Sequence, residues 1–230
     1  RSCRRGAYHP REPGMSVAVK ICGLSTPETL AAALESGADY VGFVFFPKSP
    51  RHVTLEQAAA LAAQARGKAK IVALTVDADD ALLASIASTV KPDLIQAHGA
   101  ETPERIAAIK ALTGVGVMKA LKVAGPEDIA AAKDYAAVAD LLLFDAKAPA
   151  SLKDALPGGN GLSFDWSLLA DGRGGHRFML SGGLTPENVA EAVRVTGARL
   201  VDVSSGVESA PGIKDPQRIR KFIEAVKSSG

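Results

Sequence analysis

The sequence predicts an α/β protein that folds as a single (β/α)8 TIM barrel. From Met15 onward, eight short apolar or β-branched runs alternate with eight helical stretches rich in Ala and Leu. This alternation is typical of parallel strands joined by helices, and eight such units most commonly close into a barrel. A doubly wound open sheet is the competing arrangement, but no G-x-G-x-x-G follows the first strand, as a dinucleotide site in that fold would require.

Length and composition agree with one domain. The chain has 230 residues, of which 47% are hydrophobic and 23% charged, the profile of a globular protein with one good core. A barrel of this kind takes about 250 residues, so little room is left for a second domain. We therefore expect residues 15–230 to form one catalytic barrel domain.

Each predicted strand is a short run dominated by apolar or β-branched residues, as expected for strands buried on both faces of a parallel sheet. In chain order the predicted strands are Val17–Ile21, Tyr40–Phe45, Lys70–Val76, Leu94–Ala97, Val115–Leu121, Leu141–Phe144, Phe178–Leu180 and Leu200–Val203.

A helical pattern follows every strand. Several helices open with Thr-Pro-Glu or Gly-Pro-Glu, in which Thr can cap the helix while Pro and Glu suit its first turn. The predicted helices are Pro27–Ser36, Leu55–Arg66, Asp79–Thr89, Pro103–Leu112, Pro126–Lys133, Asp165–Ala170, Pro186–Thr196 and Pro216–Lys227.

Residues 1–14 differ from the rest of the chain. They carry four arginines against Glu12, and without them 23 basic residues face 24 acidic ones, so the formal charge of +2 belongs to this segment. The body gives no support for nucleic-acid or membrane binding. The segment has no initiating Met and no apolar export region, and Met15 follows it directly. We predict a tag or another non-native, disordered extension.

Cysteine usage and hydropathy indicate the compartment. No run of 18 apolar residues is present, so no membrane-spanning helix is predicted. The two cysteines are Cys3, in the N-terminal segment, and Cys22, which makes a structural disulfide improbable and favours a reducing cytoplasm. No metal site is predicted, because His98 has no second His or paired carboxylate at ligand spacing.

Two turns of small residues end the last two predicted strands. Gly182 and Gly183 follow the seventh strand, and Ser205 and Gly206 follow the eighth. Backbone N–H groups at such turns form a natural anion site, and barrels commonly bind phosphate after these two strands. The alternative is that both are ordinary turns between strand and helix. The long loop 146–163 after the sixth strand is also expected to be functional.

Two titratable residues end strands on different sides of the predicted barrel mouth. Cys22 is the last residue of the first strand region, where a nearby cation could tune its pKa downward; the alternative is a buried cysteine packed as a small hydrophobe. Asp145 follows four apolar residues, and a salt bridge with Lys147 or Lys119 is its structural alternative. Together the two suggest a general base and a general acid.

Two further polar residues are expected at the mouth. Arg51 lies on a loop stiffened by Pro47 and Pro50, and a guanidinium held in this way suits a carboxylate or a phosphate, although surface decoration remains the alternative. His98 ends the fourth strand and is expected to be a polar wall of the pocket.

Several motifs, in order along the chain, resemble phosphoribosylanthranilate isomerases. The likeness runs from about residue 17 to residue 225. The motifs are VKICGL at 19–24, GFVFFPKSPRHV at 42–53, LIQAHG at 94–99, LLFD at 142–145, GGNGLSFDW at 158–166, LSGGLTPENV at 180–189 and DVSSGVESAPGIKD at 202–215.

The resemblance implies a cytoplasmic enzyme of tryptophan biosynthesis that converts N-(5'-phosphoribosyl)anthranilate into 1-(2-carboxyphenylamino)-1-deoxyribulose 5-phosphate by an Amadori rearrangement. It implies that Cys22 is the general base, that Asp145 is the general acid and that Arg51 holds the anthranilate carboxylate. It implies no metal and no cofactor, a small-molecule substrate as partner, and a monomer or homodimer. The residues expected around the phosphate are Gly159, Asn160, Gly182, Gly183, Ser205 and Gly206.

One departure from the family pattern concerns the loop after the sixth strand. Where the family more often reads G-G-T-G-K, this chain has Leu162 in the place of the Lys, which removes one ionic contribution to phosphate binding. Alternative functions are a catalytically silent barrel that binds a phosphorylated ligand, or another phosphosugar isomerase or epimerase. The epimerase would want paired His residues at a metal site, and the silent barrel could dispense with Cys22 or Asp145.

Overall fold

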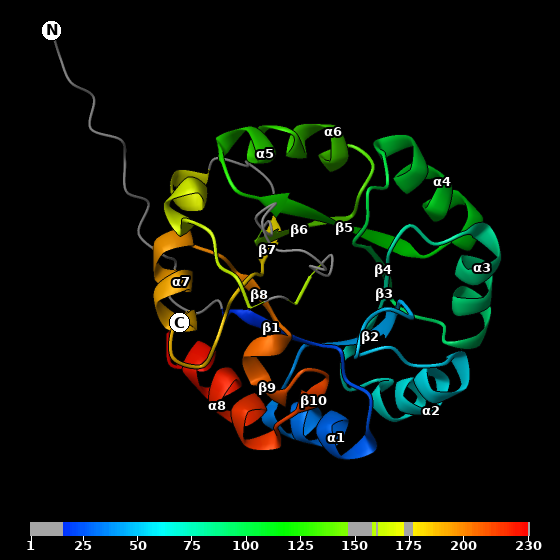
Figure 1. The fold of residues 1–230 in the computed structure, drawn as a ribbon, viewed down its shortest axis with the longest axis horizontal. Helices are drawn as coiled ribbons and strands as arrows, with labels where there is room; N and C mark the ends of the chain where they lie inside the picture. Colours follow the sequence, from blue (N-terminus) through cyan, green and yellow to red (C-terminus); the bar gives the residue numbers. More distant parts are fainter. Residues whose placement is uncertain (1–15, 147–157, 160, 173–176, 230) are drawn as a thin grey trace, which may run out of the picture.

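The computed structural model describes residues 16–146, 158–159, 161–172 and 177–229. Its centre is a closed barrel of parallel strands, each hydrogen-bonded to its neighbours in the chain, with β1 closing against β8 (Figure 1). The strands are β1 (Ala18–Cys22), β2 (Tyr40–Phe45), β3 (Lys70–Thr75), β4 (Leu94–Ala97), β5 (Gly116–Val123), β6 (Leu141–Ala146), β7 (Phe178–Leu180) and β8 (Leu200–Val203). The predicted barrel and the existence of all eight strands are confirmed.

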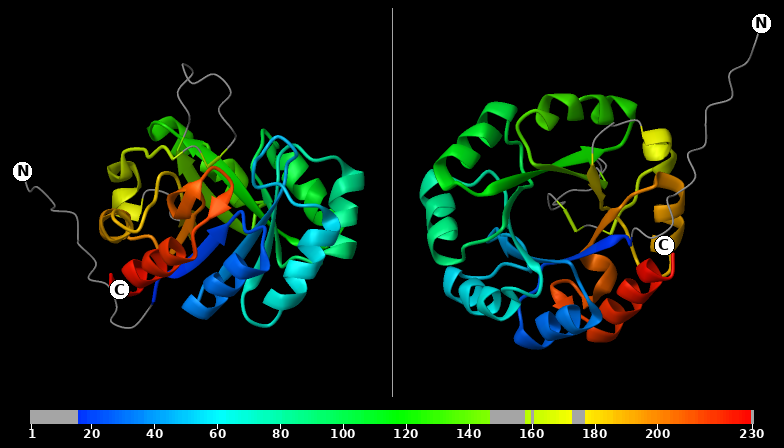
Figure 2. Two further views of the ribbon diagram at one scale, coloured as in Figure 1. Left: turned by 60° about the horizontal axis from the view of Figure 1, so that its bottom comes forward. Right: turned by 180° about the vertical axis from the view of Figure 1, so that it is seen from behind.

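Helices surround the strands in both the front and the rear views (Figures 1 and 2). They bury their apolar sides against the outside of the barrel, which explains why the strands are apolar on both faces. The helices are α1 (Pro27–Ser36), α2 (Leu55–Ala65), α3 (Asp80–Thr89), α4 (Pro103–Thr113), α5 (Pro126–Ala130), α6 (Ala132–Ala136), α7 (Val189–Thr196) and α8 (Pro216–Lys227).

Local sequence signals set the start of most helices. Thr26, Thr54 and Thr102 each accept a hydrogen bond from a backbone N–H in the first turn of α1, α2 and α4, and Asp79 does the same for α3. A proline at the first helical position follows two of these threonines, where its missing N–H costs nothing.

Three predicted helices differ from the structure. The segment predicted as Pro126–Lys133 forms the two short helices α5 and α6, and the segment predicted as Asp165–Ala170 forms the 3₁₀-helix η1 (Trp166–Gly172). Helix α7 begins at Val189 rather than Pro186, because the Asn188 side chain closes the preceding turn. It accepts from the Thr185 N–H at 2.8 Å and donates to the Gly183 carbonyl at 2.9 Å.

A small element after β8 was not predicted. The 3₁₀-helix η2 (Ser205–Val207) leads into an antiparallel pair formed by β9 (Glu208–Ala210) and β10 (Ile213–Lys214). This pair brings two charged residues, Glu208 and Lys214, back to the barrel mouth, where both side chains are buried. Residues 1–14 and Asn160, on which two predictions fall, lie outside the described residues.

Candidate active site

A pocket opens at the carboxyl ends of the strands. Parallel strands that share a barrel deliver their last residues to the same mouth, so residues far apart in sequence meet there. Most of the predicted site residues line this one pocket: Cys22, Arg51, His98, Asp145, Gly159, Gly182, Gly183 and Ser205.

Gly206 lies beside the pocket rather than in its lining. A Cβ at this position would stand 1.9 Å from the Leu184 carbonyl oxygen, so only glycine allows η2 to pack against the turn after β7. Its own carbonyl accepts from Arg218 Nε at 3.1 Å. Gly206 therefore brings the two glycine turns together without facing the cavity.

Cys22 ends β1 and is buried at the mouth, with 4% of its surface exposed. Burial raises the pKa of its thiol, and the charges of Lys20 and Lys214 act in the opposite direction without outweighing it. The expected cations are thus present, but the net shift is upward, because the cost of burying a thiolate is the largest effect. The nearby cations thus act downward, as expected from the sequence, but burial has the larger effect in the free protein.

Asp145 lies in β6 and meets His98 from the end of β4. Its Oδ2 lies 3.1 Å from His98 Nε2, and its Oδ1 accepts from the Ala146 N–H at 2.9 Å. His98 Nδ1 in turn lies 2.9 Å from Gln96 Nε2, on the same inward face of β4. The alternative salt bridge with Lys119 is not formed, because Lys119 binds Glu101 at 2.7 Å; Lys147 lies outside the described residues.

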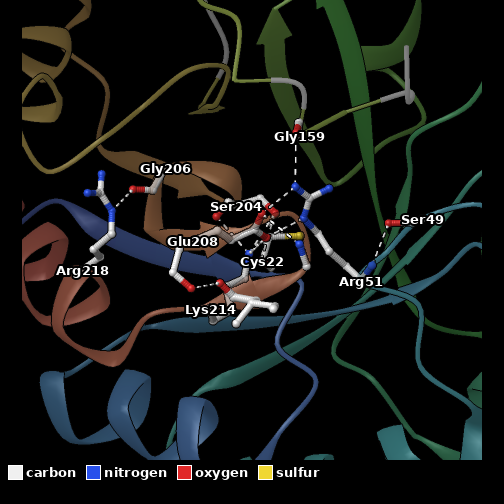
Figure 3. A network of polar contacts seen from close by, with 12 residues as sticks. Cys22, Ser49, Arg51, Gly159, Ser204, Gly206, Glu208, Lys214 and Arg218 are labelled. Carbon is white, nitrogen blue, oxygen red and sulfur yellow. Dashed lines mark hydrogen bonds and ion pairs between the residues drawn. The ribbon is translucent and has the colours of Figure 1, made fainter. Parts of the chain in front are cut away.

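Arg51 is held in a buried network rather than exposed on its loop (Figure 3). Its Nε and Nη2 donate to the two carboxylate oxygens of Glu208 at 2.7 and 2.9 Å, and Nη2 also reaches the Gly159 carbonyl at 3.2 Å. Lys214 donates to the same Glu208 carboxylate at 2.6 Å and to the Ser204 carbonyl at 2.9 Å. Among the described residues, Arg51 Nη1 has no hydrogen-bond partner and remains a donor for a ligand.

The charges of this network shift each other's titration. Burial lowers the pKa of Lys214 to about 8, although Glu208 acts to raise it. The pKa of Glu208 is lowered, because its hydrogen bond to Arg51 and the charge of Lys214 outweigh its burial. Glu208 therefore stays a carboxylate between two cations at neutral pH.

The turns after β7 and β8 have the features of an anion site. Gly182 has φ 89°, and a Cβ there would stand 2.5 Å from the Ala146 amide nitrogen, so the chain passes close to β6. None of the hydrogen bonds between described residues uses the backbone N–H of Gly183, Ser205 or Gly206. Unpaired N–H groups at a pocket mouth suit an anion such as a phosphate.

No group of three or more His, Cys, Asp or Glu side chains within the described ranges could hold a metal ion. No helix of the described chain is long and apolar enough to cross a membrane.

Comparison with known proteins identifies the family. The family model described as N-(5'-phosphoribosyl)anthranilate (PRA) isomerase matches residues 19–225. A protein of that name from Parvibaculum lavamentivorans is 59% identical over 213 residues, which cover 93% of this chain and 99% of the relative. One from Paracoccus denitrificans is 61% identical over 91% of this chain and 96% of the relative. The chain belongs to the phosphoribosylanthranilate isomerase family.

Solved structures of phosphoribosylanthranilate isomerases share the fold. The enzyme from Thermotoga maritima superposes with a TM-score of 0.82 at 37% identity, covering 92% of this chain and 99% of that one. A family structure in complex with reduced 1-(o-carboxyphenylamino)-1-deoxyribulose 5-phosphate has a TM-score of 0.80 at 36% identity, with the same coverage of both chains. A 3-hexulose-6-phosphate synthase, at 17% identity and a TM-score of 0.63, shares the barrel fold alone.

Five polar residues in or beside this pocket were not predicted as site residues from the sequence: Lys20, Gln96, Asp202, Glu208 and Lys214. Three of them carried a readable signal. Lys20 and Gln96 each stand two positions before a predicted site residue on the same strand, and alternate residues of a strand share a face. Asp202 is a charge inside an apolar strand. Glu208 and Lys214 carried no comparable signal, because their placement depends on the unpredicted β9 and β10 pair.

Proposed function

We propose that the pocket at the barrel mouth performs the family's reaction by general acid–base catalysis, with Cys22 as the base and Asp145 as the acid. The chain is an isomerase of tryptophan biosynthesis that acts on N-(5'-phosphoribosyl)anthranilate. One observation carries the assignment of roles. Cys22 on β1 and Asp145 on β6 come from different strands and line one cavity with the glycine turns.

The rearrangement needs one proton donated and one removed. Asp145 protonates the furanose ring oxygen, the bond between that oxygen and C1' breaks, and the nitrogen lone pair forms a Schiff base. Cys22 then removes the C2' proton, and the resulting enamine tautomerises to the ketone. The contact between Asp145 Oδ2 and His98 Nε2 supports the acid role, because it fixes the position of the carboxyl group in the pocket.

The two anionic ends of the substrate have separate binding groups. Arg51 Nη1 is the donor for the anthranilate carboxylate, and Glu208 holds the guanidinium so that this nitrogen faces the pocket. The phosphate binds at the backbone N–H groups of Gly183 and Ser205, with Gly159 and Gly182 beside it. Asn160, from the same loop as Gly159, is a further phosphate-binding residue in this proposal.

Localisation and assembly follow the family. We place the enzyme in the cytoplasm, as a monomer or homodimer. A structure of the Thermotoga maritima relative is described as monomers generated from a dimeric enzyme.

The test is fluorescence-monitored consumption of phosphoribosylanthranilate by the purified protein. Wild type is expected to turn over, and Cys22→Ala and Asp145→Asn are each expected to lose at least about 10²-fold in kcat, the lower end for removing an acid or a base. A protein that binds the phosphorylated substrate without consuming it would instead be the silent barrel. Unchanged turnover in either variant would refute that residue's role.

A further inference from the structure

The base of the proposed reaction has a charged neighbour beneath it on the same strand. Lys20 and Cys22 are two positions apart on β1, so both side chains point into the barrel. Lys20 is fully buried, with 0% of its side chain exposed, and it pairs across the register with Asp202 on β8. Its Nζ lies 2.8 Å from Asp202 Oδ1, while Ser181 Oγ donates to Asp202 Oδ2 at 3.0 Å.

Lys20 extends toward the sulfur of Cys22. A Cβ at Gly42, on the adjacent strand β2, would stand 3.1 Å from Cys22 Sγ and 3.3 Å from Lys20 Cε, so the two side chains share one small space. The positive charge of the Lys20 ammonium lowers the pKa of the thiol and so opposes the effect of burial. The absence of a side chain at Gly42 leaves room for this arrangement.

We propose that Lys20 is a positioning residue whose positive charge stabilises the thiolate form of Cys22, and that the negative charge of Asp202 beside it opposes this effect. A buried thiolate without a nearby cation is unfavourable, so a base at this site needs a positive charge that the substrate does not supply. The inference rests on the proposed role of Cys22 as the base, and it extends that role by naming the group that makes the base available.

Among the charged groups around Cys22, Lys20 has the largest effect on the pKa of the thiol and lowers it. The negative charge of Asp202 on β8 raises this pKa by less, and the positive charge of Lys214 on β10 lowers it by less again. Lys214 also donates hydrogen bonds to Glu208 and Ser204. The other titratable groups that line the pocket are Arg51, from the loop after β2, and His98 and Asp145, from β4 and β6.

The experiment is a titration of the Cys22 thiolate in the free enzyme, followed by its ultraviolet absorbance and by the pH dependence of alkylation with iodoacetamide. Cys3→Ser is the background, so that Cys22 is the only thiol. Lys20→Met is expected to raise the pKa of Cys22 by at least about one unit, which leaves tenfold less thiolate at a given pH. Asp202→Asn is expected to lower it, because the opposing negative charge is removed while Lys20 remains.

The opposite shifts expected for Lys20→Met and Asp202→Asn distinguish an effect of charge on the thiol from a general effect on the structure. If Lys20 and Asp202 only held the barrel together, both variants would move the titration in the same direction or leave it unchanged, and either result overturns the proposal. Lys20→Arg is expected to restore most of the wild-type titration. If Lys20→Met alone does not fold, the double variant Lys20→Met/Asp202→Asn removes both charges and is still expected to titrate above wild type, because Lys20 has the larger effect.

Lys119→Met is the matched control. Lys119 is as buried as Lys20 and pairs with Glu101 at 2.7 Å, but it lies on β5, on another part of the barrel. Its loss is expected to leave the titration of Cys22 unchanged, and an equal shift in this variant would contradict the proposal. Failure of the inference and failure of the proposed function are distinguishable, because the titration needs no substrate whereas the role of Cys22 is tested by turnover of Cys22→Ala.

Discussion

Replacement of Glu208 by Gln tests whether the buried network at the mouth is a structural and binding unit. The Glu208 side chain is 4% exposed and accepts from Arg51 at 2.7 and 2.9 Å and from Lys214 at 2.6 Å. The substitution keeps the size of the side chain but leaves two buried cations without their counter-ion. Uncompensated charge in a buried site is the main cost of such a change.

The size of the effect follows from this geometry. Removing one partner of a buried ion pair costs about 3–5 kcal/mol, and the value expected here is about 3 kcal/mol, because the Gln carbonyl can still accept from one of the donors. For a chain of this length about 1 kcal/mol corresponds to about 2–4 °C, so Tm is expected to fall by about 6–12 °C. The KM for phosphoribosylanthranilate is also expected to rise, because the Arg51 guanidinium is less firmly held.

Urea unfolding and thermal melting at neutral pH measure the effect, with Glu191→Gln as the control. Glu191 also pairs with an arginine, Arg194, but both side chains lie at the surface, at 54% and 70% exposure. Loss of that exposed pair is expected to leave stability almost unchanged. If Glu208→Gln were as mild as Glu191→Gln, the account of a buried, mutually dependent network would be refuted.

Two further predictions use the same pocket. Arg51→Ala is expected to raise KM at least about tenfold with a smaller change in kcat, because a charged hydrogen bond to substrate is lost, and a normal KM would contradict the carboxylate role. For Lys214 the folded pKa of about 8 lies below the usual 10.5, so between these pH values the unfolded chain binds more protons and stability rises with pH. Relative to Lys214→Met, wild type is expected to gain up to about 3 kcal/mol across this window, and a difference that does not grow with pH in chemical denaturation would contradict the burial of this ammonium.

The barrel could be predicted because its signals are local and repeated. Strands buried on both faces are continuous apolar runs, and caps such as Thr26 and Thr54 indicate where helices begin. The errors occurred where tertiary contacts decide the conformation. The side chain of Asn188 closes the turn before α7, so a helical pattern that starts at Pro186 does not form a helix there.

The candidate site likewise contains residues that could be predicted from local sequence and residues whose placement depends on tertiary contacts. Residues at strand ends, such as Cys22 and Asp145, could be predicted to meet, since the fold places all strand ends at one mouth. The charged groups that surround Cys22 and Asp145 could not be predicted from the sequence. The charge of Lys20 was visible in the sequence, but its pairing with Asp202 across the closure of the barrel depends on register. The hydrogen bonds that hold the Arg51 guanidinium come from Glu208, which lies 157 residues away in the chain.

The assignment of Cys22 as the general base and Asp145 as the general acid is tested most directly by a kinetic isotope effect measured in a single turnover. With phosphoribosylanthranilate deuterated at C2', Cys22→Ser is expected to show a larger isotope effect than wild type, because a weaker base makes removal of this hydrogen rate-limiting. Asp145→Asn is expected to show a smaller one, because ring opening then limits the rate. Isotope effects that change in the same direction in both variants, or in the reverse order, would contradict the assignment of base and acid.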